Sequence, residues 1–165
     1  MTERIQNLIN ALRDELKEYG EMLALLDRQQ QSVIERHADE VFQSVGFIRR
    51  QADTITSARA LLEESLRTTV QDFLLPADAG FTTLIPLLPA EYRPLVKALV
   101  DENNELLVRV QQRARQNHLL LSRSLELMQG LLDTLLPSRE TRVYNGRGSM
   151  QVHETVPRSF YQGVG

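Results

Sequence analysis

Residues 3–36 read ERIQNLINALRDELKEYGEMLALLDRQQQSVIER, and the spacing of the apolar residues in this stretch decides the fold. These residues follow one another at steps of three and four, with one gap at Gln30; they are Ile5, Leu8, Leu12, Leu16, Tyr19, Leu23, Leu26 and Val33. Such spacing places the apolar side chains along one side of an α-helix that packs against other helices. We therefore expect a first long helix over about residues 3–36.

A second apolar stripe with the same spacing runs from Val41 to Phe73. Between the two stripes, residues 35–39 contain no apolar residue except Ala38, and Asp39 is suited to cap the start of a second helix. One unbroken helix over residues 1–75 would be ~110 Å long and could not bury its own stripe. The sequence therefore predicts a second helix over about residues 39–74, folded back antiparallel on the first.

A third long helix is predicted over about residues 91–136, with Pro94 in its first turn, where proline is tolerated. At ~69 Å this helix would be longer than either partner, so one of its ends should project or bend. The connection over residues 76–90, PADAGFTTLIPLLPA, is unusually apolar, and we expect it to pack on the bundle with one short helical turn. The predicted fold is all-α, an antiparallel bundle of three long helices.

The C-terminal segment, residues 138–165, differs from the rest of the chain. It has no sustained apolar period, and it contains four Arg against two Glu. A segment with so few periodic apolar residues cannot form a core of its own. We therefore expect residues 1–137 to form one helical domain and residues 138–165 to form a flexible tail.

The composition excludes several classes of function. The chain has 165 residues, a net charge of −3 and no Cys, which removes disulfides, thiolate zinc sites and cysteine nucleophiles. No apolar run approaches the roughly 18 residues of a membrane span, and the N-terminus MTERIQNLIN lacks the apolar segment of an export signal. Arginines are dispersed without interleaved aromatic residues, so we expect no nucleic-acid partner.

No constellation of catalytic or metal-ligating residues is visible in the sequence. Di-metal sites in helical bundles use Glu-x-x-His pairs, and none of His37, His118 and His153 has a Glu three residues before it. The chain has no G-x-x-x-x-G-K-[ST] phosphate loop, and its acidic residues lie among arginines on predicted polar faces. We therefore expect no enzyme, no bound metal and no cofactor.

The end of the third predicted helix is more apolar than a partner of a helical hairpin requires. Around Leu121, apolar side chains spread over roughly half of the helix circumference; they are Leu120, Leu125, Leu127, Met128, Leu131, Leu132, Leu135 and Leu136. One interpretation is that a helix in the groove between two others needs a wide apolar face. The other is a second contact surface for an amphipathic partner helix.

Three amides occupy stripe positions in the predicted helices: Gln30, Asn103 and Asn117. Buried amides commonly fix the register of packed helices at some cost in stability. The alternative is a hydrated patch that a partner recognises. The residues alone leave both interpretations open.

Several short motifs resemble the FlgN family of flagellar export chaperones. They are Leu-x-x-Glu-x-x-x-Tyr over residues 12–19, the runs 23–26 and 29–31, the break His37-Ala38-Asp39, the segment 58–62, and Tyr144-Asn145-x-x-Gly148. The resemblance implies a cytoplasmic bacterial protein that binds the terminal helices of hook-associated proteins at the hook–filament junction. It also implies that the protein keeps these helices from aggregating and delivers them to the flagellar type III export apparatus.

The resemblance and the wide apolar face together predict where partners bind. The resemblance implies that the C-terminal region grips the cargo. The expected partner-binding residues are Leu121, Leu125, Leu132, Leu136, Tyr144, Asn145 and Gly148. Export gate components are further implied partners, and we expect a monomer or a weak homodimer. The competing hypothesis is a constitutive coiled-coil scaffold or homodimeric adaptor with no chaperone role.

Overall fold

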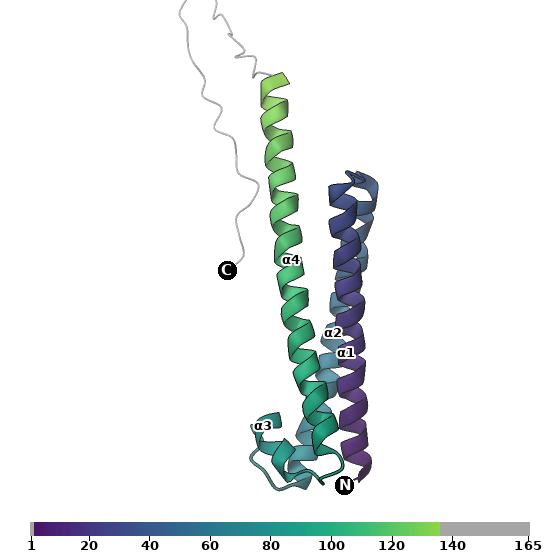
Figure 1. Ribbon diagram of the computed structural model, residues 1–165, viewed down its shortest axis with the longest axis vertical. Coiled ribbons are helices and arrows are strands. Elements are labelled where there is room, and N and C mark those ends of the chain that lie inside the picture. The colour runs from purple at the N-terminus through teal and green to yellow at the C-terminus, as the bar shows by residue number, and fades with distance from the viewer. Residues whose placement is uncertain (1, 136–165) are drawn as a thin grey trace, which may run out of the picture. The chain divides into compact units, whose positions relative to one another are not determined.

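The computed structural model describes residues 2–135, apart from the side chains of Asp133 and Leu135. The elements in this range are α1 (Thr2–Ile34), α2 (Ala38–Asp72), the single turn α3 (Phe81–Leu84), the 3-10 turn η1 (Ile85–Leu87) and α4 (Arg93–Leu135) (Figure 1). No strand occurs among the described residues, so the prediction of an all-α fold is confirmed. The three long helices are α1, α2 and α4, and α3 is a short helical turn within the connection 76–90, so the described residues contain four α-helices rather than three. The predicted tail, residues 138–165, lies outside the described range.

The chain divides into two compact units, Met1–Ser124 and Leu125–Gly165. The first unit contains α1, α2, α3, η1 and the part of α4 up to Ser124. The described part of the second unit is the remainder of α4, residues 125–135.

In the first unit, α1 and α2 run antiparallel side by side (Figure 1). Arg4 in the first turns of α1 forms an ion pair with Asp72, the last residue of α2, with 2.6 Å between Nη1 and Oδ1. Nearer the middle of both helices, Gln51 Nε2 donates a hydrogen bond to the Glu18 carboxylate at 2.7 Å. The chain therefore folds back between the two stripes, as their spacing predicts.

The turn between α1 and α2 differs from the prediction in its boundaries and its cap. α1 ends at Ile34 and α2 begins at Ala38, so each boundary lies one or two residues earlier than expected. The N-cap of α2 is His37, which makes no side-chain capping hydrogen bond. Asp39, expected as the cap, lies instead in the first turn of α2. Its negative charge there interacts favourably with the positive end of the helix dipole.

Both hairpin helices end in a Schellman arrangement, and neither has the glycine that this arrangement favours. After α1, the His37 N–H donates to the Ser32 carbonyl at 2.9 Å, around Arg36 with a φ of 61°. After α2, the Leu75 N–H donates to the Val70 carbonyl at 3.2 Å, around Leu74 with a φ of 55°. A left-handed backbone disfavours side chains with a Cβ, so both helix ends are strained.

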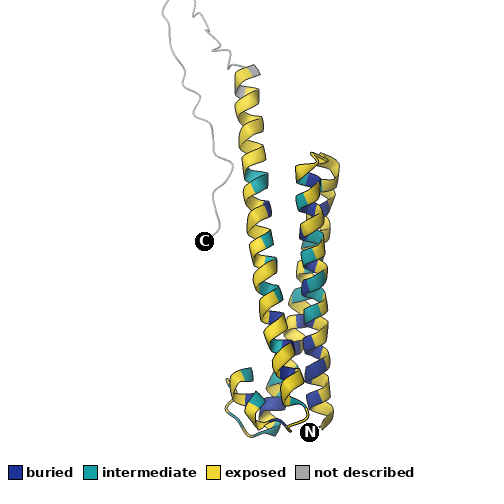
Figure 2. Cartoon of the chain, viewed as in Figure 1, coloured by how far each residue is buried: buried dark blue, intermediate teal, exposed yellow. Residues whose placement is uncertain are grey.

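The apolar core of the first unit gathers side chains from α1, α2, α4 and the connection between α2 and α4 (Figure 2). Its buried members are Ile5, Leu8, Ile9, Ala11, Leu12, Leu62, Val70, Leu84, Leu88, Val96 and Leu99. Leu84 and Leu88 belong to the apolar connection, and both are fully buried. The connection is therefore part of the core.

Within the first unit, α4 runs parallel to α1 at a constant offset. Asn103 Nδ2 donates to the Leu12 carbonyl at 3.0 Å, and Asn117 Nδ2 donates to the Leu26 carbonyl at 2.7 Å. Each pair is separated by 91 residues in the sequence. The two asparagines are two heptads apart, so they occupy the same position in the helical repeat and fix one register.

Candidate functional site

Five apolar side chains of the second unit are each more than half exposed. They are Leu125, Leu127, Met128, Leu131 and Leu132, with exposed fractions from 52% to 76%. At about 100° per residue they span an arc of roughly 160°, and Glu126 lies on the opposite side of the helix. Exposed apolar surfaces of this kind mark interaction sites. Residues 125–132, here called the C-terminal apolar face, are the candidate functional site.

The structure describes three of the seven sequence-predicted site residues. Leu125 and Leu132 both belong to the C-terminal apolar face and are exposed. Leu121 lies in the first unit and is half-buried. The other four lie outside the described residues; they are Leu136, Tyr144, Asn145 and Gly148.

A chain of hydrogen bonds crosses the three long helices of the first unit. Asn117 Nδ2 in α4 lies 3.1 Å from Gln29 Oε1 in α1, and Gln29 Nε2 donates to Ser44 Oγ in α2 at 2.9 Å. Ser44 Oγ in turn donates to the Val41 carbonyl at 2.6 Å. Asn117, Gln29 and Ser44 are all buried. This network replaces apolar packing where α4 meets the hairpin around Leu26.

The buried amides of α4 are only partly satisfied. Among the described residues, Asn103 Oδ1 and Asn117 Oδ1 are buried without a hydrogen-bond partner. An unpaired buried oxygen costs about 1–3 kcal/mol, which offsets part of the gain from each Nδ2–carbonyl bond. The sequence placed both asparagines at stripe positions. In α1 it pointed to Gln30, whereas the buried amide of that helix is Gln29.

Gln30 has a different partner, because it faces the guanidinium of Arg113. Arg113 Nη1 donates to Gln30 Oε1, and Arg113 Nε lies 3.1 Å from Asp27 Oδ1. These two contacts join α4 to α1. Along α4 they lie between the positions of Asn103 and Asn117. Both Arg113 and Asp27 remain partly exposed, so the ion pair contributes little to stability.

A second cluster of polar residues joins α1 to α2. The Tyr19 hydroxyl donates to Glu15 Oε1 at 2.9 Å and accepts a hydrogen bond from Arg59 Nη2. Burial raises the pKa of Tyr19 to about 12, and the hydrogen bond to the Glu15 carboxylate adds to the shift. The Leu-x-x-Glu-x-x-x-Tyr motif over residues 12–19 therefore places two hydrogen-bonded side chains one turn apart.

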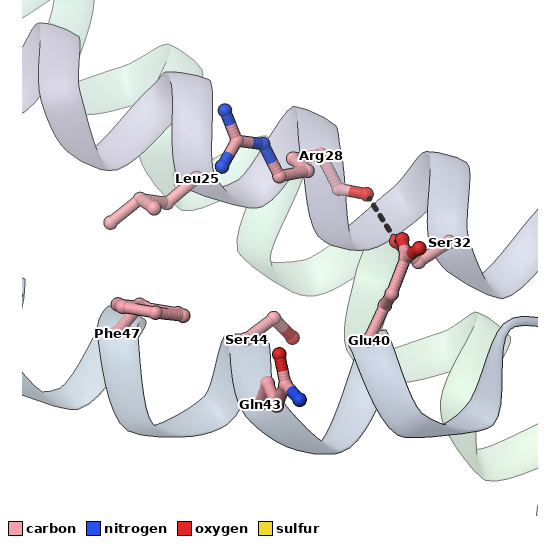
Figure 3. A pocket seen from close by; sticks show the side chains of 7 residues that line it. All are labelled: Leu25, Arg28, Ser32, Glu40, Gln43, Ser44 and Phe47. Carbon is pink, nitrogen blue, oxygen red and sulfur yellow. Dashed lines mark hydrogen bonds between the residues drawn. The ribbon is translucent and has the colours of Figure 1, made fainter.

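A pocket of about 350 Å³ opens between the end of α1 and the start of α2 (Figure 3). It is lined by Leu25, Arg28, Ser32, Glu40, Gln43, Ser44 and Phe47. Ser32 Oγ lies 2.9 Å from Glu40 Oε2, and Leu25 and Phe47 form the apolar end of the pocket (Figure 3). The lining offers no His or Cys, so it has no activated nucleophile of the Ser–His or Cys–His type.

The structure describes two of the three histidines, His37 and His118. His37 Nδ1 lies 3.4 Å from a Glu35 carboxylate oxygen and is exposed, His118 is exposed in α4, and His153 lies outside the described residues. In the described part of the chain, no group of three or more His, Cys, Asp or Glu side chains is placed to hold a metal ion.

Within residues 2–135, no helix is long and apolar enough to cross a membrane.

These features define a helical-bundle protein with an apolar core, buried amides between its long helices and exposed apolar side chains over residues 125–132. A family model described as FlgN protein matches residues 1–151, which is most of the chain. The chain belongs to the FlgN family, a family of flagellar export chaperones, and the resemblance noted in its short motifs is confirmed. Neither the curated proteins nor the solved structures contain a match to this chain.

Proposed function

We propose that this protein binds the terminal helices of hook-associated proteins in the cytoplasm, keeps them from aggregating and delivers them to the flagellar type III export gate. The family supports a role in flagellar export. The cargo, the delivery step and the location are the proposed parts. The C-terminal apolar face is the proposed binding surface for the cargo.

The observation that carries this proposal is the exposure of Leu125 and Leu132 on one side of α4. The two residues are seven positions apart, so they lie two turns apart along the same side of the helix. An amphipathic helix recognises such a surface through apolar residues spaced three, four and seven apart. A terminal helix of a hook-associated protein is a partner of that kind.

Residues beyond α4 complete the proposed binding region. The family match extends to residue 151 and therefore includes Leu136, Tyr144, Asn145 and Gly148. A segment without a core of its own can order when it binds, and so it can wrap a helical partner. We propose that these four residues contact the same cargo helix as the C-terminal apolar face.

The double variant Leu125→Asp/Leu132→Asp tests the proposal. Both side chains are exposed, so the thermal midpoint should change little, while binding to a peptide of the helical terminus of a hook-associated protein should weaken by ~3–6 kcal/mol. The matched control is Val108→Asp/Leu119→Asp, because both side chains are exposed on the opposite side of α4. The control should bind as tightly as the unaltered chain.

Two outcomes would contradict this proposal. Unfolding of the Leu125→Asp/Leu132→Asp variant would show that these leucines belong to a core, because burying an unpaired charge is strongly destabilising. A dimer that persists on dilution in sedimentation, and is lost in the same variant, would favour the constitutive scaffold.

A further inference from the structure

The C-terminal apolar face consists of two stripes. On an α-helix, Leu125, Met128 and Leu132 fall within ~60° of one another. Leu127 and Leu131 form the second stripe, whose centre lies roughly 110° around the helix from the first. Both stripes are exposed over their whole length.

A single partner helix covers only one of these stripes. A two-stranded coiled coil uses one narrow apolar strip on each helix, and a wider strip indicates packing against more than one neighbour. A lone helix seated on Leu125, Met128 and Leu132 would leave the stripe of Leu127 and Leu131 in water. The width of the face therefore fits two neighbouring helices.

The first unit provides the precedent, because α4 already packs there against two helices. Val96 and Leu99 of α4 share one core cluster with Leu12 of α1 and Leu62 of α2. Residues 125–132 of the second unit have an apolar face of the width that suits a helix with two neighbours.

We propose that the C-terminal apolar face binds two packed helices at once, one on each stripe. This inference rests on the proposed function and names the form of the cargo, which presents a helical pair that takes the place of a hairpin. A second copy of the chain is a poorer occupant. A stable interface needs roughly 20–30 residues on each side, and this face offers five large side chains.

Calorimetric titration of the full chain tests the inference with three probes. They are a peptide of the N-terminal helical segment of a hook-associated protein, a peptide of its C-terminal segment, and one polypeptide that joins both as a hairpin. Two variants each remove one stripe: Leu125→Gln/Leu132→Gln and Leu127→Gln/Leu131→Gln. The control is Val108→Gln/Leu119→Gln on the opposite side of α4, and circular dichroism checks that every variant stays folded.

The expected result is a separate response for each stripe. The hairpin should bind the unaltered chain more tightly than either peptide, and each stripe variant should weaken hairpin binding about 10- to 100-fold. Each single peptide should respond to only one stripe variant, and the two peptides should respond to different ones. The control should change none of these affinities.

Other outcomes separate the failure of this inference from the failure of the proposed function. If one peptide binds as tightly as the hairpin and loses affinity in both stripe variants, a single helix spans the face, and only the inference of a helical pair is overturned. If none of the three probes binds the unaltered chain, the proposed function is overturned together with the inference.

Discussion

Asn103 of α4 and Leu12 of α1 are 91 residues apart in the sequence, yet the Asn103 Nδ2 and the Leu12 carbonyl oxygen are 3.0 Å apart. The same bond recurs two heptads further along, between Asn117 and Leu26. These two contacts fix how α4 lies along the hairpin in the first unit. They do so with polar groups at positions where packed helices usually place apolar residues.

The two asparagines differ in what their removal leaves behind, and this predicts opposite effects on stability. Asn103→Leu removes an unpaired buried oxygen and adds apolar contact, so the free energy of unfolding should rise by about 1 kcal/mol. Asn117→Leu also leaves Gln29 Oε1 without its donor, so the free energy of unfolding should fall by about 1–2 kcal/mol. Urea denaturation measures both changes, and equal effects of the two variants would contradict the network.

At the end of α2, we expect the substitution Leu74→Gly to stabilise the protein. Its φ of 55° strains a residue with a Cβ, and its side chain is 93% exposed, so Leu74→Gly relieves strain without loss of packing. After the entropy that glycine adds to the unfolded chain, the net gain should be ~0.5–1 kcal/mol. Thermal unfolding measures it. Leu74→Ala is the control and should change little, because alanine keeps the strain; equal gains in both variants would refute the explanation.

The Tyr19 cluster predicts a loss of stability at high pH. The pKa of Tyr19 is about 12 in the folded chain and 10 when it is unperturbed, so the folded state holds this proton more tightly. The stabilisation is complete below pH 10 and is lost as the pH rises toward 12, by on the order of 2 kcal/mol. Chemical denaturation of the unaltered chain and of Tyr19→Phe, compared across this range, isolates the effect. A difference between them that does not vary with pH would contradict it.

We expect removal of residues 138–165 to change cargo binding without changing stability. That segment has no sustained apolar period, so the thermal midpoint of a chain that ends at residue 137 should stay nearly the same. Its affinity for the helical terminus of a hook-associated protein should fall sharply if Tyr144, Asn145 and Gly148 contact the cargo. Calorimetry measures the affinity, and unchanged binding would remove these residues from the proposed site.

Periodicity predicted the long helices well because their apolar residues recur at steps of three and four over many turns. The fold-back near residue 37 followed from the polar gap between the stripes. The ends of the hairpin helices were shifted by up to two residues because Arg36 and Leu74 occupy left-handed positions where glycine is expected. A helix end with a left-handed residue other than glycine cannot be located from the sequence, because arginine and leucine are not typical of that conformation.

The candidate site was predicted less completely than the fold. Leu125 and Leu132 are exposed and Leu121 is half-buried, and a role of these three residues in binding stays a prediction. Stripe spacing identified Asn103 and Asn117, whereas Gln29 was missed because steps of three and four lead from Leu26 to Val33 equally well through Gln29 or Gln30. Arg59 was missed as well, since its partners Glu15 and Tyr19 lie on another helix and periodicity does not report contacts across helices.

The hydrogen bonds from Asn103 and Asn117 end on main-chain oxygens, which every residue type provides. The register of α4 on α1 therefore does not depend on which side chains occupy positions 12 and 26. During evolution, α1 can exchange its apolar residues for others of similar size while the third long helix keeps its alignment. A chain built in this way can diverge far in sequence and still keep α4 aligned with α1 in the first unit.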